Sequence, residues 1–298
     1  MPGADAIYRY LEHPGGDACS PVDCGDSQHV IDLSVGSPLL GADPANAELA
    51  PLTHLIAADM RRAQVDVAFG RYAEARGIYG APAFGGGAHP TAERRTEHLG
   101  IDIFCAPGSP VRAPLPATVE LVANNRAPLD YGPLVVLRHR TPCGEVFFSL
   151  YGHLRAQSIS NLTPGDELAS GESFAAVGDE TENGGWTPHL HLQVILDLLQ
   201  LGPDFPGVAA PSQAATWRAL SPSPAPLLPG PDPAQLDGST DAGRLQQRRE
   251  AALCGALRLS YRRPLHVVKG YRQYLYDSDA RCYLDAYNNV AHVGHCHP

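Results

Sequence analysis

The stretch EHLGIDIF, residues 97–104, decides how the fold of this sequence is interpreted. It places His98 four residues before Asp102, with apolar residues around both. Successive side chains of a β-strand alternate between its two faces, so residues an even number apart project from the same face. A helix is disfavoured because Gly100 and Ile101 lie between the pair and a proline-rich run follows. As a strand, the stretch would direct an imidazole and a carboxylate into the same space.

Two further histidine motifs lie on strand-like sequence. SLYGHL, residues 149–154, contains His153, and TPHLHLQV, residues 187–194, contains His189 and His191 two positions apart. A single histidine in a strand is most often a structural residue, but three neighbouring strands with these motifs would form one cluster. Imidazole nitrogen and carboxylate oxygen suit zinc, which takes three protein ligands in catalytic sites. The motifs together therefore predict a zinc site.

The surrounding residues predict a mainly β fold. Residues 93–200 contain short runs rich in Val, Leu and Phe, separated by Pro, Gly, Asn and Asp turns, which is typical of an antiparallel sheet or sandwich. Upstream, alternating apolar residues predict a strand over 29–37, and helical spacing predicts a helix near 50–63. GRYAEARGIYG, residues 70–80, is expected to be a charged, solvated connection.

The C-terminal third changes in composition. Prolines, serines and glycines dominate residues 206–245 and predict an extended, poorly packed linker. A helix is expected within 244–263, followed by a short strand pair with a DSDA turn. The expected organisation is an α+β N-terminal extension of unknown role (1–85), a β domain (86–205), the linker (206–245) and a C-terminal segment (246–298).

Composition limits the classes of partner. The chain has 298 residues, 44% of them hydrophobic and 18% charged, which fits a globular protein. The net charge is −10 and no basic run is present, so neither nucleic acid nor an anionic membrane surface is an expected partner. No apolar run of about 18 residues and no secretory signal is recognised. Seven scattered cysteines without a CxxC pair then favour reduced thiols and a cytoplasmic location.

The histidine motifs and their surroundings show a family resemblance. HLGID, YGHL and PHLHLQV resemble the HxxxD, inner-histidine and HxH motifs of the lysostaphin-type zinc metallopeptidases. Three neighbouring passages also resemble the family's turns and hairpin: residues 108–119, 130–139 and 165–180. The resemblance covers about residues 93–197 and implies an antiparallel β-sheet or sandwich.

Carried over residue by residue, the resemblance implies roles for the five polar residues. His98, Asp102 and His191 match the metal ligands, and His153 and His189 match the two catalytic histidines. The implied activity is a zinc-dependent peptidase or amidase acting on a peptide or amide substrate. Zinc lowers the pKa of its water toward about 7 and polarises the scissile carbonyl. His153 or His189 would take the proton of the water or hydrogen-bond the tetrahedral oxyanion, and the other would help the departing amine.

One loop departs from the family pattern. DETENGGWTP, residues 179–188, precedes the HxH motif and is longer and more acidic than the family's usual turn. In the family, this loop borders the substrate groove, and the usual substrates are short peptide cross-links, often next to glycine. The departure therefore puts a peptidoglycan substrate in question.

A second resemblance covers residues 255–298. RPLHVVKGYRQYLYDSDARCYLDA and the following AYNNVAHVGHCHP are similar to the beginning of class III aminotransferase-like enzymes, particularly ethanolamine-phosphate phospho-lyases. This similarity explains HVGHCHP without a metal. The family's Schiff-base lysine lies further downstream, and Lys269, the single lysine here, is not its equivalent. Pyridoxal phosphate is therefore expected only in a full-length parent protein, and no residue of this chain is assigned to bind it.

The two resemblances together predict a fragment of a multidomain protein. In this hypothesis the truncated aminotransferase class III-like segment continues into an adjoining domain, which is a partner of the metallopeptidase domain. The alternative is that the β domain is a non-catalytic binding or regulatory module of the pyridoxal-phosphate enzyme.

Overall fold

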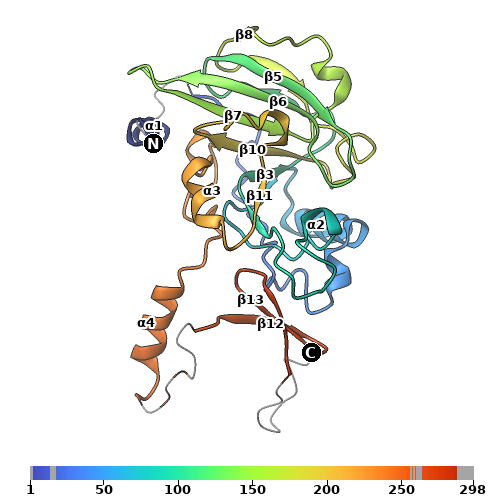
Figure 1. Cartoon of the computed structure of the whole chain (residues 1–298). Coiled ribbons are helices and arrows are strands. Elements are labelled where there is room, and N and C mark those ends of the chain that lie inside the picture. The colour runs from blue at the N-terminus through green and yellow to red at the C-terminus, as the bar shows by residue number, and fades with distance from the viewer. Residues whose placement is uncertain (1–2, 14–17, 256, 258, 260–263, 287–298) are drawn as a thin grey trace.

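The computed structural model describes residues 3–13, 18–255, 257, 259 and 264–286. These residues form a mainly β structure built on one large antiparallel sheet, as the sequence predicts (Figure 1). The aminotransferase-like motif at 287–298 lies outside the described residues.

The large sheet has seven strands in the order β1-β3-β10-β7-β6-β5-β8. Strands β5, β6 and β7 follow one another along the chain as an antiparallel meander, whereas β3 and β10 are brought together from distant parts of the sequence. The strands are β1 (Ala68–Phe69), β3 (Ile101–Phe104), β5 (Ala117–Asn125), β6 (Gly132–Arg140), β7 (Val146–Gly152), β8 (Glu167–Leu168) and β10 (His189–Ile195).

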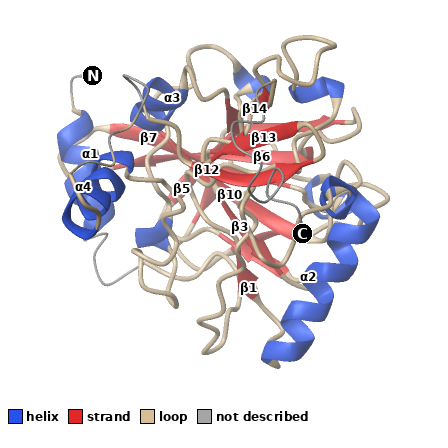
Figure 2. Cartoon of the chain, turned by 90° about the horizontal axis from the view of Figure 1, so that it is seen from below, coloured by secondary structure: helices blue, strands red, loops and turns tan. Residues whose placement is uncertain are grey.

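Short strand pairs and helices surround this sheet. The pairs are β2 (Glu97–His98) with β11 (Val208–Ala209) and β4 (Pro110–Arg112) with β9 (Ser173–Ala176). The helices are α1 (Ala4–Glu12), α2 (Leu49–Ala63), α3 (Ala214–Leu220), α4 (Ala242–Ala252) and the 3-10 turns η1 (Pro44–Ala47), η2 (Pro82–Phe84), η3 (Ala156–Ile159), η4 (Gly202–Asp204) and η5 (Ala225–Leu227). Figure 2 shows the α-helices toward the rim and strands at the centre. Among the described residues, no helix has the length and apolar character needed to cross a membrane.

Alternation along β3 and β10 explains why the polar motifs lie on one face of the sheet. Ile101 and Ile103 from β3 pack with Leu190 and Leu192 from β10 in the main hydrophobic core. The intervening residues project from the opposite face, because side chains in a strand alternate with a period of two. Burial of the apolar side chains of each strand in the core thus places its polar side chains on the opposite face of the sheet.

The N-terminal segment is part of this fold. Phe69 in β1 is fully buried and pairs with Ile103, and the Ile31 amide donates a hydrogen bond of 2.8 Å to the Phe69 carbonyl. The strand predicted over 29–37 is not formed, because only Val30 makes a bridge to a neighbouring strand. Its three alternating apolar residues are nevertheless buried. Two of them, Ile31 and Leu33, pack with α2, whose position agrees with the predicted helix.

Residues 206–245 do not form a poorly packed linker along their whole length. Leu227 and Leu236 are buried, and the backbone of Tyr72 exchanges hydrogen bonds with Leu236 (2.9 Å) and Gly238 (2.7 Å). The prediction is therefore wrong for the part up to Gly238. Prolines there restrict the backbone without preventing the apolar side chains between them from packing.

The C-terminal described residues form a separate small sheet. Its strands are β12 (Val267–Tyr271), β13 (Tyr274–Asp277) and β14 (Cys282–Leu284), one more than the predicted pair. The helix expected within 244–263 is α4, which ends at Ala252. The sheet lies at the opposite end of the molecule from β5 and β8 (Figure 1). The Thr96 hydroxyl joins it to the domain by donating a 2.8 Å hydrogen bond to the Asp279 carbonyl.

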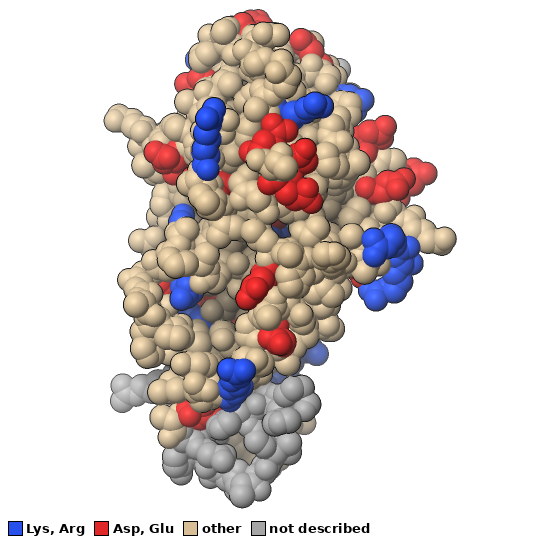
Figure 3. All heavy atoms as spheres, turned by 90° about the vertical axis from the view of Figure 1, so that its right-hand side faces the viewer, with Lys and Arg blue, Asp and Glu red and all other residues tan. Residues whose placement is uncertain are grey.

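The surface on the α2 side of the molecule has no single charge sign. Figure 3 shows acidic and basic side chains interspersed among residues without charge on this face. A long-range electrostatic field of one sign is therefore not a property of this face.

We expect Phe69→Ala to destabilise the whole fold by about 3–5 kcal/mol, because it removes a fully buried aromatic side chain. The free energy of unfolding in guanidinium chloride measures the effect. Leu284→Ala, at a side chain that is 53% exposed, is the control and should change it by less than about 0.5 kcal/mol. Equal unfolding midpoints for Phe69→Ala and the unchanged protein would show that β1 is not part of the cooperative unit.

Candidate metal centre

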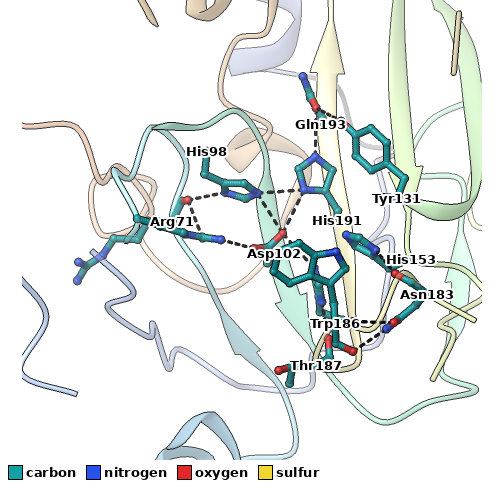
Figure 4. A network of polar contacts seen from close by, with 12 residues as sticks. Arg71, His98, Asp102, Tyr131, His153, Asn183, Trp186, Thr187, His191 and Gln193 are labelled. Carbon is teal, nitrogen blue, oxygen red and sulfur yellow. Dashed lines mark hydrogen bonds and ion pairs between the residues drawn. The ribbon is translucent and has the colours of Figure 1, made fainter. Parts of the chain in front are cut away.

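The three polar motifs meet on neighbouring strands. In the register of β10, His191 lies between Asp102 of β3 and Gly152 of β7, and His153 directly follows Gly152. His189 lies two residues before His191 on the same face of β10. The structure thus brings all five predicted site residues together, and each is at most 6% exposed (Figure 4).

Three side-chain atoms from two histidines and one aspartate converge at nearly equal distances. His98 Nε2 lies 3.0 Å from His191 Nδ1, and each of these nitrogens lies 3.1 Å from Asp102 Oδ1. The three residues form the one cluster of possible metal ligands found among the described residues. Figure 4 shows the two rings directed toward the carboxylate.

The outer nitrogen of each ring identifies its tautomer. His98 Nδ1 lies 3.0 Å from the main-chain oxygen of Arg71, and His191 Nε2 lies 3.1 Å from Gln193 Oε1. Both partners accept hydrogen bonds, so these ring nitrogens carry the hydrogens. Gln193 is held in this orientation because its amide nitrogen donates to the Pro206 carbonyl and the hydroxyl of Ser221. In the neutral form of each ring, the hydrogen is therefore on the outer nitrogen and the inner nitrogen is an acceptor.

Three acceptors therefore face one another with no hydrogen between them. Burial, with the charge of Arg76, lowers the pKa of His98 to about 4, so this ring is neutral near neutral pH. Lone pairs at this separation repel unless a cation lies among them. Donor atoms of a tetrahedral zinc with bonds of about 2.0–2.1 Å lie roughly 3.3 Å apart, close to the observed spacing. Two imidazole nitrogens and one carboxylate oxygen thus fit zinc in number, type and separation.

The remaining two histidines each have Nδ1 bound to a main-chain carbonyl. His153 Nδ1 is 2.8 Å from the Asn183 carbonyl, and His189 Nδ1 is 2.6 Å from the Thr187 carbonyl. Both Nδ1 atoms therefore carry hydrogens, and both Nε2 atoms are acceptors. The rings lie 4.3 Å apart, and His189 Nε2 is 3.5 Å from Asp102 Oδ1. Burial lowers the pKa of both histidines, which keeps them neutral and able to take up a proton.

The backbone at His153 has an unusual conformation. Its φ angle is 63°, in the left-handed region that side-chain-bearing residues seldom adopt. Hydrogen bonds hold it there: the His153 amide donates to Tyr131 (2.8 Å), and the Gly178 amide donates to the His153 carbonyl (2.9 Å). Residues kept in such strained conformations are concentrated at functional sites.

The stretch 97–104 is divided into two short strands. His98 belongs to β2 and Asp102 to β3, so the single continuous strand expected from the sequence is not observed. The break is at Gly100, where an added Cβ would lie 2.6 Å from both His191 Cε1 and the Leu192 carbonyl. Glycine is required because the backbone passes directly against the His191 ring.

Sequence analysis missed two buried charged residues beside the site. Arg76 Nη1 lies 2.5 Å from Asp102 Oδ2, and Arg76 Nε lies 2.8 Å from Glu74 Oε2. Glu74 is fully buried and Arg76 is 1% exposed, so the prediction that residues 70–80 are solvated is wrong here. The available signal was the Glu-x-Arg spacing between apolar residues, which places both side chains on one side of an extended segment.

The arginine determines how Asp102 presents its carboxylate. Because Arg76 binds Oδ2, only Oδ1 faces the imidazoles. Burial opposes ionisation of Asp102, but the adjacent His98 and Arg76 outweigh it and hold its pKa well below the usual value. The carboxylate is thus charged and fixed in orientation, both of which metal binding requires.

A cavity of about 360 Å³ opens beside these residues. The five site residues form part of its lining. Much of the remaining lining is apolar and comes from α2, from the segment following Arg76, and from the 179–188 loop. We call this part the apolar wall; it consists of Leu52, Ile56, Ile78, Tyr79, Phe84 and Trp186.

Comparison with known proteins agrees with this geometry. Residues 96–202 match peptidase family M23. They form an M23 peptidase domain. The chain is 35% identical over 105 residues to a protein of Haemophilus influenzae described as an uncharacterized metalloprotease, covering 35% of this chain and 20% of that protein.

Solved structures similar to the M23 domain include two peptidases. A zinc-containing peptidase from Vibrio cholerae is 27% identical, with 36% of this chain and 30% of that chain covered and a TM-score of 0.29. The catalytic domain of lysostaphin from Staphylococcus simulans is 22% identical, with 39% and 77% covered and a TM-score of 0.29.

Short matches to aminotransferases support the second resemblance. The chain is 57% identical over 44 residues to an alanine–glyoxylate aminotransferase 2-like protein of Drosophila melanogaster, covering 14% of this chain and 9% of that protein. It is 45% identical over 53 residues to a mitochondrial homologue from Arabidopsis thaliana, covering 17% and 11%. The chain thus spans a fifth or less of these curated relatives.

We expect Arg76→Met to destabilise the M23 domain by about 3–5 kcal/mol, because it leaves the Glu74 carboxylate buried without its partner. Chemical denaturation measures the change. Arg71→Met is the matched control: Arg71 lies 3.4 Å from Asp32 and 3.7 Å from Glu74 and is 28% exposed, so its loss should cost less than about 1 kcal/mol. Equal effects of the two changes would contradict a specific role for the buried pair.

Proposed function

We propose that the M23 domain is a zinc-dependent hydrolase that cleaves a peptide or amide bond. His98 Nε2, Asp102 Oδ1 and His191 Nδ1 are the proposed zinc ligands. The observation that carries this proposal is the convergence of these three atoms at 3.0–3.1 Å from one another. Peptidase family M23 membership supports the same assignment.

The two other histidines are the proposed acid–base pair. When bound, zinc activates a water molecule and polarises the carbonyl of the scissile bond. His153 and His189 present neutral Nε2 atoms, and one of them accepts the proton of the attacking water. The same imidazole passes that proton to the departing amine as the C–N bond breaks, and the Nε2 atom of the second imidazole accepts a hydrogen bond from the attacking water.

Elemental analysis tests the metal assignment. We expect one zinc per chain in protein purified with the metal supplied. Asp102→Ala should lose it because two histidines alone lack the third protein ligand. His139→Ala is the control, since this histidine is bound by the Pro116 carbonyl and Ser149 away from the site and should not change zinc content. Absence of stoichiometric zinc from the unchanged protein would refute the proposal.

Substitution of His153 separates catalysis from metal binding. His153→Ala should keep its zinc but hydrolyse peptides about 100- to 10,000-fold more slowly, the usual contribution of a general acid–base group. Turnover of a fluorogenic peptide library, with zinc content measured on the same samples, gives both values. If His153→Ala lost zinc as completely as His191→Ala, the proposed division between ligands and catalytic residues would be wrong.

We infer further that the segment 246–298 begins an aminotransferase-like region of a longer protein. The 44- and 53-residue matches support this. Lys269 lies on β12 and does not line the cavity of the M23 domain, and we assign it no role in binding pyridoxal phosphate. These matches also support the second candidate, a binding or regulatory module of the aminotransferase. A domain that binds zinc but hydrolyses no peptide would favour that candidate.

A further inference from the structure

The cavity of the M23 domain is divided between polar and apolar surfaces. The histidines and Asp102 form one side, and the apolar wall forms another. Three of its aromatic rings pack together: Tyr79 lies 4.9 Å from Phe84 and 6.2 Å from Trp186, centroid to centroid. Aromatic rings packed in this way offer a large, rigid apolar surface.

Most of the apolar wall comes from outside the M23 match. Leu52 and Ile56 belong to α2, and Ile78 precedes the match as well. The position of these side chains is set by the packing of the N-terminal segment on β1 and β3. The cavity is therefore shaped by sequence that the family motifs do not include.

Trp186 connects the apolar wall to the catalytic histidines. Its ring centroid lies 6.2 Å from that of His153. Asn183 fixes both residues: its carbonyl accepts from His153 Nδ1 (2.8 Å), and its side-chain amide donates to the Trp186 carbonyl (2.9 Å). Figure 4 shows Trp186, Asn183 and His153 grouped on one side of His191. An apolar group against Trp186 would thus lie next to the site of bond cleavage.

The size and burial of the cavity limit what it can hold. About 360 Å³ is near the lower end of the range for small-molecule sites and accommodates a short peptide. A glycine has no side chain to place against the apolar wall. An aromatic or branched aliphatic side chain of the peptide would leave water on contact with the wall and gain the hydrophobic contribution.

We propose that the M23 domain selects short peptides in which a residue beside the cleaved bond carries an aromatic or branched aliphatic side chain bound to the apolar wall. This rests on the proposed hydrolase function and specifies its substrate class. It departs from the preference for glycine that the lysostaphin-type resemblance implies.

Binding of dipeptides tests the proposal without requiring catalysis. NMR titration of the zinc-free full chain with Gly-Phe, Phe-Gly, Gly-Leu and Gly-Gly gives their dissociation constants. We expect at least one of the apolar dipeptides to bind ~10–100-fold more tightly than Gly-Gly, the gain expected for burying one large side chain. Gly-Gly binding as tightly as all the others would overturn the proposal.

Variants locate the preference on the apolar wall. Trp186→Ala should remove most of the preference for apolar dipeptides over Gly-Gly, whereas Trp186→Phe should retain this preference. Trp217→Ala makes the same change in α3, outside the cavity lining, and should leave the preference intact. Ile78→Ser, at a half-buried position, should weaken it several-fold and provides a second test if Trp186→Ala does not fold. A preference unchanged in both Trp186→Ala and Ile78→Ser would refute the assignment to the wall.

Hydrolysis by the zinc-loaded chain separates this proposal from the one on which it rests. Cleavage of Gly-Phe or Gly-Leu faster than Gly-Gly supports both. Faster cleavage of glycine peptides would overturn the substrate class while leaving the hydrolase function in place. Selective binding of apolar dipeptides with no hydrolysis of any peptide would support the apolar site and overturn the hydrolase function.

Discussion

The carboxylate of Asp102 is the group on which the site depends, because its two oxygens serve different partners. Oδ2 is held at 2.5 Å by Arg76, and Oδ1 lies 3.1 Å from one ring nitrogen of each of His98 and His191. Oδ2 thus needs the buried guanidinium of Arg76 as its partner, and Oδ1 forms a cluster of acceptor atoms with the two histidine nitrogens. The pairing of β3 with β10, which puts His191 opposite Asp102, makes both possible.

Residues outside the family match at 96–202 supply contacts that support the proposed metal site of the M23 domain. Arg76 and Glu74 lie between β1 and the start of the match at residue 96, and Ser221, which orients Gln193, follows its end. Each of these contacts supports a side chain that orients a proposed ligand. Loss of a supporting contact of this kind typically lowers metal affinity or activity about 10- to 100-fold.

The strands and the five polar residues could be predicted because their signals are local. A period of two along 97–104 and 187–194 is a property of a few adjacent residues, and it indicates which side chains share a face. Arg76 and Glu74 could not be predicted, since charged residues are normally solvated and their burial depends on Asp102, which is distant in sequence. The segment 29–37 shows the converse: its alternation correctly indicated burial, but its partner strand β1 has only two residues, and a single bridge from Val30 to Phe69 forms.

The left-handed backbone of His153 implies a conflict between stability and activity at one position. A glycine or asparagine adopts a φ of 63° at lower cost than histidine, so either residue would relieve local strain. Neither supplies an imidazole next to His189. Selection of this chain for heat resistance alone would therefore favour replacing the proposed catalytic base, and a screen for stabilised variants would need to keep residue 153 unchanged.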